Sequence, residues 1–157
     1  MEITLCTDRH DVEKCAILMH HSEPWTTLGF DLKRCTDSLQ GDYRECYIIK
    51  NSGTIAGFVV LQFYGLLRGY IQTICVIPEL RGQGIGTILL QFSESRIRKV
   101  SPNVFMCVSS FNIDAQRLYA RLGYEQVGIL KDHLVRGQDE YLLRKSSGPF
   151  NEFVASA

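Results

Sequence analysis

Apolar and polar residues recur along the chain with two periods, and these periods predict its elements. Alternation and short apolar runs bounded by turn residues indicate strands, whereas apolar residues three and four apart indicate helices. The expected strands are residues 3–7, 46–49, 55–64, 70–77, 104–108, 126–130 and 141–144. The expected helices begin near residues 8–11, 31, 85 and 113.

The resulting order, β-α-α-β-β-β-α-β-α-β-β, predicts a mixed sheet with helices on its faces, an α/β or α+β sandwich. The 157 residues fit a single domain spanning 1–157, large enough to bury a core of its own. Residues 146–157 show no clear periodicity, so we expect this tail to be frayed.

One stretch joins a strand to a helix through a glycine-rich turn. The strand from Tyr70 to Ile77 is expected to stop at Pro78, which cannot donate to a sheet ladder. The turn Arg81-Gly82-Gln83-Gly84-Ile85-Gly86 follows and opens a helix. The first N–H groups of a helix are unpaired, and glycines let a ligand approach them, so this turn predicts an anion site, most naturally for phosphate. An ordinary glycine-rich turn is the alternative.

Two familiar phosphate-binding motifs do not fit this turn. A Walker loop needs Lys and then Ser or Thr after its last glycine, but Thr87 follows Gly86 directly. A dinucleotide fingerprint spaces its glycines as Gly-x-Gly-x-x-Gly, whereas here they alternate.

The turn instead resembles the Arg/Gln-x-x-Gly-x-Gly motif of the GNAT superfamily of acyl-CoA-dependent N-acetyltransferases. A second GNAT signature is matched by Asn112-x-x-Ala115-x-x-Leu118-Tyr119-x-x-x-Gly123-Tyr124. The two motifs occur in the family's order, and the resemblance covers roughly residues 45–145. It implies a mostly antiparallel mixed sheet of about seven strands flanked by four helices. It also implies that a bulge splays the sheet in the middle, at an acyl-CoA slot.

The resemblance assigns roles to residues of both motifs and of the strand before the turn. The turn would bind the pyrophosphate of acetyl-CoA, and backbone groups of the strand would bind its pantetheine arm. Of the implied catalytic residues, Val76 N–H would donate to the oxyanion and Tyr119 would protonate the leaving thiolate. Asn112 would lie near the pantetheine or order a water molecule. The cofactor-binding set is Ile74, Cys75, Val76, Arg81, Gly82, Gln83, Gly84, Ile85, Gly86, Thr87, Asn112 and Tyr119.

Other readings of these residues remain open. Tyr119 lies on the apolar face of its helix and could simply pack on the sheet, and Asn before a helix is a good N-cap. Cys75 and Cys107 could be nucleophiles, but no motif places a His beside them, so packed thiols are the better interpretation.

The general base is missing from its usual places. Family members carry a glutamate on the strand before the turn, where Tyr70 and Gln72 stand, or on the next strand, where Cys107 stands. A water chain or a residue of the N-terminal half would then take the proton, with Glu23, His20 and His21 as candidates. The acceptor groove is expected between the loop around Trp25, the hairpin end near Tyr64 and the turn near His133. Its candidate residues are Trp25, Glu23, Tyr64, Tyr70 and Gln72.

Charge and cysteine content narrow the class of protein. The 17 basic and 17 acidic residues balance, so no electrostatic footprint for nucleic acid is present. No apolar stretch is long enough to span a membrane, and the first residues lack the pattern of a signal peptide. The six cysteines never form Cys-x-x-Cys, which favours reduced, packed thiols in a cytoplasmic protein and no metal site.

We therefore predict an N-acetyltransferase that moves the acetyl group of acetyl-CoA to a primary amine by direct attack in a ternary complex. The amine, of a small molecule or of a protein or peptide, and the presence of a homodimer are left open. One rival is a catalytically silent GNAT-like module that binds acyl-CoA as a sensor or scaffold. Another is a nucleotide-binding structural domain.

Overall fold

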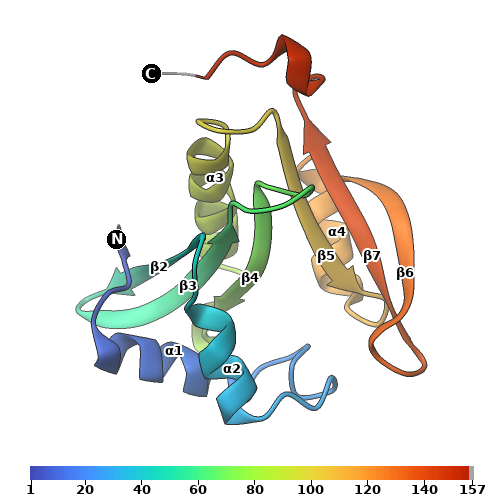
Figure 1. Cartoon of the computed structure of the whole chain (residues 1–157). Coiled ribbons are helices and arrows are strands. Elements are labelled where there is room, and N and C mark those ends of the chain that lie inside the picture. The colour runs from blue at the N-terminus through green and yellow to red at the C-terminus, as the bar shows by residue number, and fades with distance from the viewer. Residues whose placement is uncertain (156–157) are drawn as a thin grey trace.

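The computed structural model describes residues 1–155, which form a mixed seven-stranded sheet with helices on both faces (Figure 1). The strand order is β1-β2-β3-β4-β5-β7-β6, and every neighbouring pair is antiparallel except β4 and β5. The strands are β1 Glu2–Leu5, β2 Arg44–Asn51, β3 Thr54–Gln62, β4 Tyr70–Val76, β5 Asn103–Ser109, β6 Glu125–Val135 and β7 Gln138–Ser146. The order of helices and strands read from the periodicity is confirmed.

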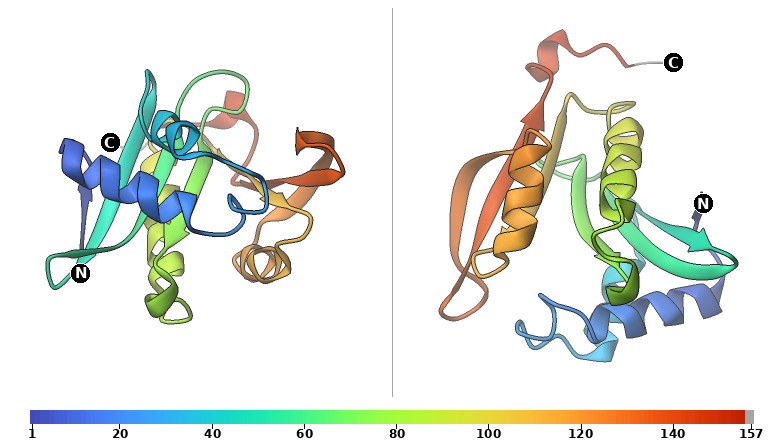
Figure 2. Two further views of the ribbon diagram at one scale, coloured as in Figure 1. Left: turned by 90° about the horizontal axis from the view of Figure 1, so that it is seen from below. Right: turned by 180° about the vertical axis from the view of Figure 1, so that it is seen from behind.

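Two helices cover each face of the sheet (Figure 2). Helices α1 (Arg9–His20) and α2 (Leu32–Leu39) lie on one face, where the core is built around Phe58 and Val60. Helices α3 (Ile85–Ile97) and α4 (Ile113–Arg121) lie on the other. None of the helices within residues 1–155 is long and apolar enough to cross a membrane.

The two N-terminal helices begin where the sequence places their caps. The carboxylate of Asp8 accepts hydrogen bonds from the first turn of α1, and Asp31 does the same for α2. Their buried residues recur at helical spacing, with Val12, Cys15 and Met19 among those on α1. Four of the six cysteines are buried, which confirms the prediction of packed thiols for these four.

The C-terminal part is more extended than the sequence predicts. Strand β6 starts at Glu125 and continues to Val135, although only residues 126–130 are expected as strand, because pairing with β7 orders its exposed polar residues. Strand β7 continues to Ser146, and residues Phe150–Glu152 form a 3₁₀ turn whose Phe150 lies under Arg68, 4.9 Å from ring centroid to guanidinium carbon. The fraying expected for the tail from residue 146 stays a prediction, with this local structure within it. Residues 156–157 lie outside the described residues.

The junction between β4 and β5 is short. Within residues 1–155 these parallel strands pair only through Tyr70 with Phe105 and Ile71 with Met106. Beyond Ile71 strand β4 remains paired with β3, and β5 remains paired with β7 along its whole length. The strands diverge past the junction, as Figure 1 shows. This leaves the β5-facing side of β4 without a strand partner from Gln72 to Val76.

Candidate active site

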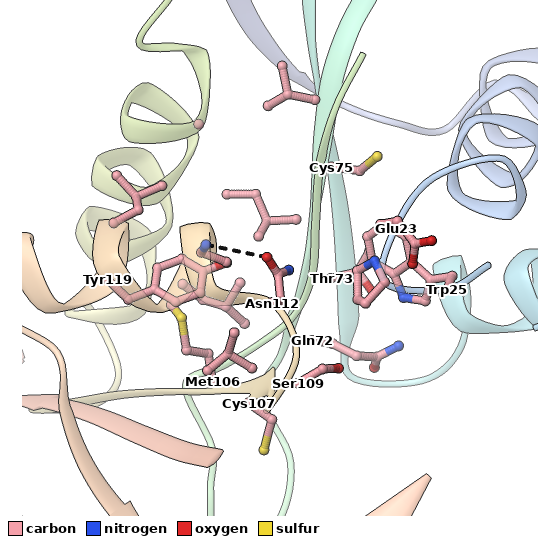
Figure 3. A pocket seen from close by; sticks show the side chains of 18 of the residues that line it. Glu23, Trp25, Gln72, Thr73, Cys75, Met106, Cys107, Ser109, Asn112 and Tyr119 are labelled. Carbon is pink, nitrogen blue, oxygen red and sulfur yellow. Dashed lines mark hydrogen bonds between the residues drawn. The ribbon is translucent and has the colours of Figure 1, made fainter. Parts of the chain in front are cut away.

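A cavity of about 1050 Å³ opens where β4 and β5 part (Figure 3). Its walls come from both strands, the start of α3, one side of α4, the loop between α1 and α2, and the hairpin between β6 and β7. Tyr119 and Asn112 lie on one side of the view, and Trp25 and Glu23 on the other. Residues distant in the chain therefore meet in one chamber.

The glycine-rich turn forms one end of this cavity. Gly84 is the N-cap of α3 with φ 84°, a left-handed conformation that favours glycine, and it supplies no side-chain cap. The first intrahelical bond runs from Ile88 N–H to Gly84 O, so the preceding N–H groups of the first turn have no helical partner. Gly82, Gly84, Gly86 and Thr87 line the cavity. The predicted anion site at the start of α3 therefore opens into the cavity.

Gln83 and Ile85 do not line the cavity with the other turn residues. Gln83 turns back, and its Nε2 donates to Glu79 O at 3.2 Å. Ile85 is 2% exposed and belongs to the core beneath α3. Their side chains hold the turn in place, so any contact of these two residues with a ligand would come from the backbone.

Arg81 stands at the rim of the cavity with a fixed orientation. Its Nε donates to Val76 O at 3.1 Å, so the side chain bridges the end of β4 and the glycine-rich turn. One N–H is thereby used in positioning the guanidinium, whose other N–H groups project from the same planar fork. The arginine lines the cavity and carries the charge expected beside an anion.

The register of β4 determines which of its backbone groups face the cavity. Ile77 N–H bonds to Ala56 O, and hydrogen-bonded and non-hydrogen-bonded pairs alternate along an antiparallel ladder. The N–H and C=O of Cys75 therefore point to β3, while those of Ile74 and Val76 point away from it. The carbonyl of Val76 meets Arg81 on that side, which agrees with this assignment. The structure thus favours Ile74 and Val76 for backbone contacts and argues against the expected contribution of Cys75.

Tyr119 and Asn112 enter the cavity from α4. Asn112 caps this helix, with Oδ1 accepting from Ala115 N–H at 3.3 Å, and it also lines the cavity. Tyr119 packs edge-on against Tyr124, 6.1 Å between ring centroids, and belongs to the core. Burial raises the pKa of Tyr119 to about 12, so its phenol is protonated at neutral pH. The packing and capping readings both hold, and both side chains still reach the cavity.

The cavity wall across from Tyr119 carries most of the residues expected to bind the acceptor amine. Trp25, Glu23, Tyr70 and Gln72 line the cavity, as do His133 and Leu134 of the β6–β7 hairpin. Tyr64 does not line it, because it stacks on Tyr43 on the outer surface with 5.0 Å between ring centroids. The expected contribution of Tyr64 has no support from this arrangement.

Gln72 has an unusual environment on this wall. It is the extra residue of a bulge, since Thr73 pairs with Val60 and Ile71 with the next residue, Leu61. Its Nε2 donates to Ser38 O at 2.8 Å, while its buried Oε1 has no partner among the described residues. A buried acceptor without a donor is costly, so this oxygen is suited to an N–H donor of a ligand.

The histidines and thiols proposed as alternatives are not arranged for catalysis. Nδ1 of His20 hydrogen-bonds Phe30 O at 3.0 Å, and neither His20 nor His21 lines the cavity. Burial raises the pKa of Cys75 to about 11 and raises that of Cys107 as well, so both thiols are protonated at neutral pH. No group of three His, Cys, Asp or Glu side chains suited to a metal ion occurs in residues 1–155.

Sequence reasoning missed a buried carboxylate in this cavity. Glu140 of β7 is 4% exposed and lines the cavity, and its Oε1 accepts from Ser109 Oγ at 2.6 Å. Burial raises its pKa. Its polar neighbours in sequence led to its assignment to a turn. Extending the alternation of Tyr141 and Leu143 backward would have placed it in the strand.

Comparison with known proteins places this geometry in context. A sequence model of the Acetyltransferase (GNAT) family matches residues 11–124. An N-alpha-acetyltransferase of Sulfurisphaera tokodaii is 35% identical over 78 residues, which cover 48% of this chain and 47% of that protein. The chain thus spans about half the length of this curated relative.

Two solved structures show the same fold. The ribosomal-protein-S18-alanine N-acetyltransferase of Escherichia coli matches with a TM-score of 0.74 at 20% identity, over 98% of this chain and 99% of that one. An aminoglycoside 6'-N-acetyltransferase complexed with coenzyme A matches with a TM-score of 0.76 at 13% identity, over 95% and 98%.

Proposed function

The chain belongs to the GNAT family of acetyltransferases, and we propose that it transfers an acetyl group from acetyl-CoA to a primary amine by direct attack in a ternary complex. One observation carries this proposal. The anion-binding end of α3 and the phenol of Tyr119 open into the same cavity as the wall around Trp25. A phosphate-bearing donor and an amine acceptor can therefore meet there.

The chain's residues fit coenzyme A in three places. The N–H groups at the start of α3 and the guanidinium of Arg81 suit the pyrophosphate, because both favour negative charge. Unpaired backbone groups of Ile74 and Val76 suit the amides of the pantetheine arm, as an added strand would. The separation of β4 and β5 provides the slot for this arm. Acetyl-CoA supplies the activated acyl group as a thioester.

The protein then stabilises the charges that the transfer creates. Val76 N–H faces the cavity and can donate to the carbonyl oxygen as it becomes negative. Tyr119 holds a proton for the departing sulfur. Its raised pKa makes it a weak acid, but a thiolate that departs into the same buried chamber is desolvated as well and binds a proton more tightly.

The acceptor is proposed to arrive as a cation. Its wall combines the aromatic ring of Trp25 with the carboxylates of Glu23 and Glu140 and the free oxygen of Gln72. Aromatic faces, carboxylates and amide oxygens all attract an ammonium group.

Thiol release from acetyl-CoA across a panel of amines tests the proposal. A diamine, an aminoglycoside, lysine and a short peptide with a free N-terminus serve as probes, with calorimetry of coenzyme A binding in parallel. Amine-dependent release supports a transferase. Tight coenzyme A binding without release by any amine would indicate the silent module, and competition by ATP or NAD would indicate a nucleotide-binding domain.

A further inference from the structure

We propose that Glu140 is the general base that takes the proton of the acceptor amine. This inference rests on the proposed function and assigns a role that the family's usual glutamate positions cannot fill here. Those positions hold Tyr70, Gln72 and Cys107. Glu140 comes instead from β7, two strands away from β4 in the sheet.

The register of the sheet places Glu140 on the acceptor side. Glu140 pairs directly with Ser109 at the end of β5, so their side chains share a face of the sheet. The alternate residues of these strands, Val108 and Leu143, belong to the core under α3 and α4, on the other face. Tyr119 also lies on that other face. The proposed base and the proposed acid therefore flank the gap between β4 and β5 from opposite sides.

The hydrogen bonds of Glu140 leave one oxygen for the substrate. Ser109 Oγ donates to Oε1, which fixes the carboxylate, and Oε2 has no partner among the described residues. Glu140 interacts electrostatically with the phenol of Tyr70 and the thiol of Cys107. It also interacts with His133 of β6. These are the titratable groups that face it from β4, β5 and β6. The unpartnered oxygen of Gln72 supplies a second acceptor for the amine on the same wall.

Among residues 1–155, the other carboxylates that line the cavity are less suitable as a base. Glu23 is exposed in the α1–α2 loop, where hydrogen bonds from Thr26 and Thr27 lower its pKa, so it binds a proton weakly. Asp114 is almost fully exposed at the start of α4, on the Tyr119 side.

An ordinary ammonium has a pKa of about 10.4 and an ordinary glutamic acid about 4.3, so direct proton transfer from the amine to a carboxylate is uphill. Burial raises the pKa of Glu140 and so narrows the difference between the pKa of the base and that of the amine.

The proposed step balances as follows. The ammonium gives one proton to Glu140, which becomes a carboxylic acid, and the nitrogen lone pair forms a bond to the thioester carbon. The carbon–sulfur bond breaks and its electron pair leaves on sulfur, which takes a proton from Tyr119. The second proton of the nitrogen restores Tyr119, and Glu140 returns its proton to solvent as the acetylated product leaves.

Glu140→Gln tests the assignment, because the amide keeps the volume and can still accept from Ser109 but cannot take a proton. With acetyl-CoA and the fastest amine of the panel, we expect kcat to fall about 10²- to 10⁴-fold, with unchanged coenzyme A affinity by calorimetry. The acidic limb of the kcat profile should disappear. With hydroxylamine, which is largely neutral at neutral pH, the loss should shrink because no proton has to be removed before attack.

Two further variants make the test decisive. Ser109→Ala keeps the carboxylate but removes a donor that stabilises its charged form, so the acidic limb should move up by about one pH unit. Glu23→Gln removes a carboxylate from the same cavity and should retain the acidic limb, whatever it does to KM. If Glu140→Gln does not fold, the shift with Ser109→Ala carries the test, and an unshifted limb would reject the base.

The outcomes also separate this inference from the proposed function. A wild-type protein that releases no thiol with any amine refutes the transferase itself, and the base with it. An active wild type whose Glu140→Gln variant keeps its turnover and acidic limb rejects only the base. An equal loss with hydroxylamine and with charged amines would mean that Glu140 merely supports the wall.

Discussion

The left-handed conformation of Gly84 gives a sharp test of the anion site. Gly84→Ala adds one carbon that meets no protein atom within 4 Å, so the change is not blocked by crowding. The alanine must adopt φ near 84°, which costs about 1–2 kcal/mol of stability, or about 2–8 °C in Tm for a chain of this length. Because Gly84 lines the cavity, the added carbon also occupies space that an anion needs to reach the N–H groups of α3.

The expected loss of affinity follows from those N–H groups. Each hydrogen bond to a charged phosphate contributes about 1.5–3 kcal/mol, so the loss of one weakens coenzyme A binding roughly 10- to 100-fold. The larger, branched side chain of Gly84→Val should abolish binding while the fold survives. Calorimetry gives the affinity, and thermal melts of the same samples give the stability.

Gly53 offers a matched control in the β2–β3 hairpin. It has φ 80°, and a carbon added there also meets no protein atom within 4 Å. Gly53→Ala should therefore lose a similar amount of stability and keep full affinity for coenzyme A. Equal affinities in the Gly84 and Gly53 variants, at comparable Tm losses, would refute the assignment of the turn to the pyrophosphate.

The remaining predictions concern charge and protons. Arg81→Ala should raise KM for acetyl-CoA more than it lowers kcat, and the defect should be smaller with acetyl-pantetheine; equal defects on both donors would mean that Arg81 only holds the turn through Val76. Tyr119→Phe should lower kcat about 10²- to 10⁴-fold with little change in Tm, and the loss should shrink for a thioester with a more acidic thiol. If Tyr119→Phe keeps wild-type turnover in an assay where chemistry limits the rate, Tyr119 only packs in the core. The raised pKa of Glu140 means that its contribution to stability is present below about pH 4.3 and is lost as pH rises through the folded value. Melts of Glu140→Gln should therefore show a Tm advantage over the wild type at neutral pH that disappears in acid; the same difference at both pH values would contradict a raised pKa.

Local pattern predicted most of the fold because its signals lie within single elements. The caps at Asp8 and Asp31, the turn at Gly53 and the glycine-led start of α3 are properties of a few adjacent residues. They appear in the structure where the sequence places them. The expected strand from residue 70 agrees in its start and ends at Val76, one residue before the expected Ile77.

The site residues that sequence reasoning missed depend on contacts between distant segments. Glu140 stands in a polar stretch that looks like a turn, and it is buried because β5 pairs with β7 across 31 residues of chain. The orientation of Gln72 depends on a bulge that no local pattern predicts. Cys75 was expected to present its backbone to the ligand, but which groups of a strand face outward follows from its register with β3.

The two-residue pairing between β4 and β5 joins two halves of the sheet, β1-β2-β3-β4 and β5-β7-β6, at one corner. Past this corner β4 pairs only with β3 and β5 only with β7, so no ladder hydrogen bond crosses the gap between them among residues 1–155. Behind the sheet, helix α3 connects to the other side of this gap. Its Glu94 accepts hydrogen bonds from Lys145 of β7 at 2.8 Å and from Tyr124 at 3.0 Å. These contacts tie α3 to the β7 side of the gap, so widening the cavity for an acyl group larger than acetyl would have to strain or break them.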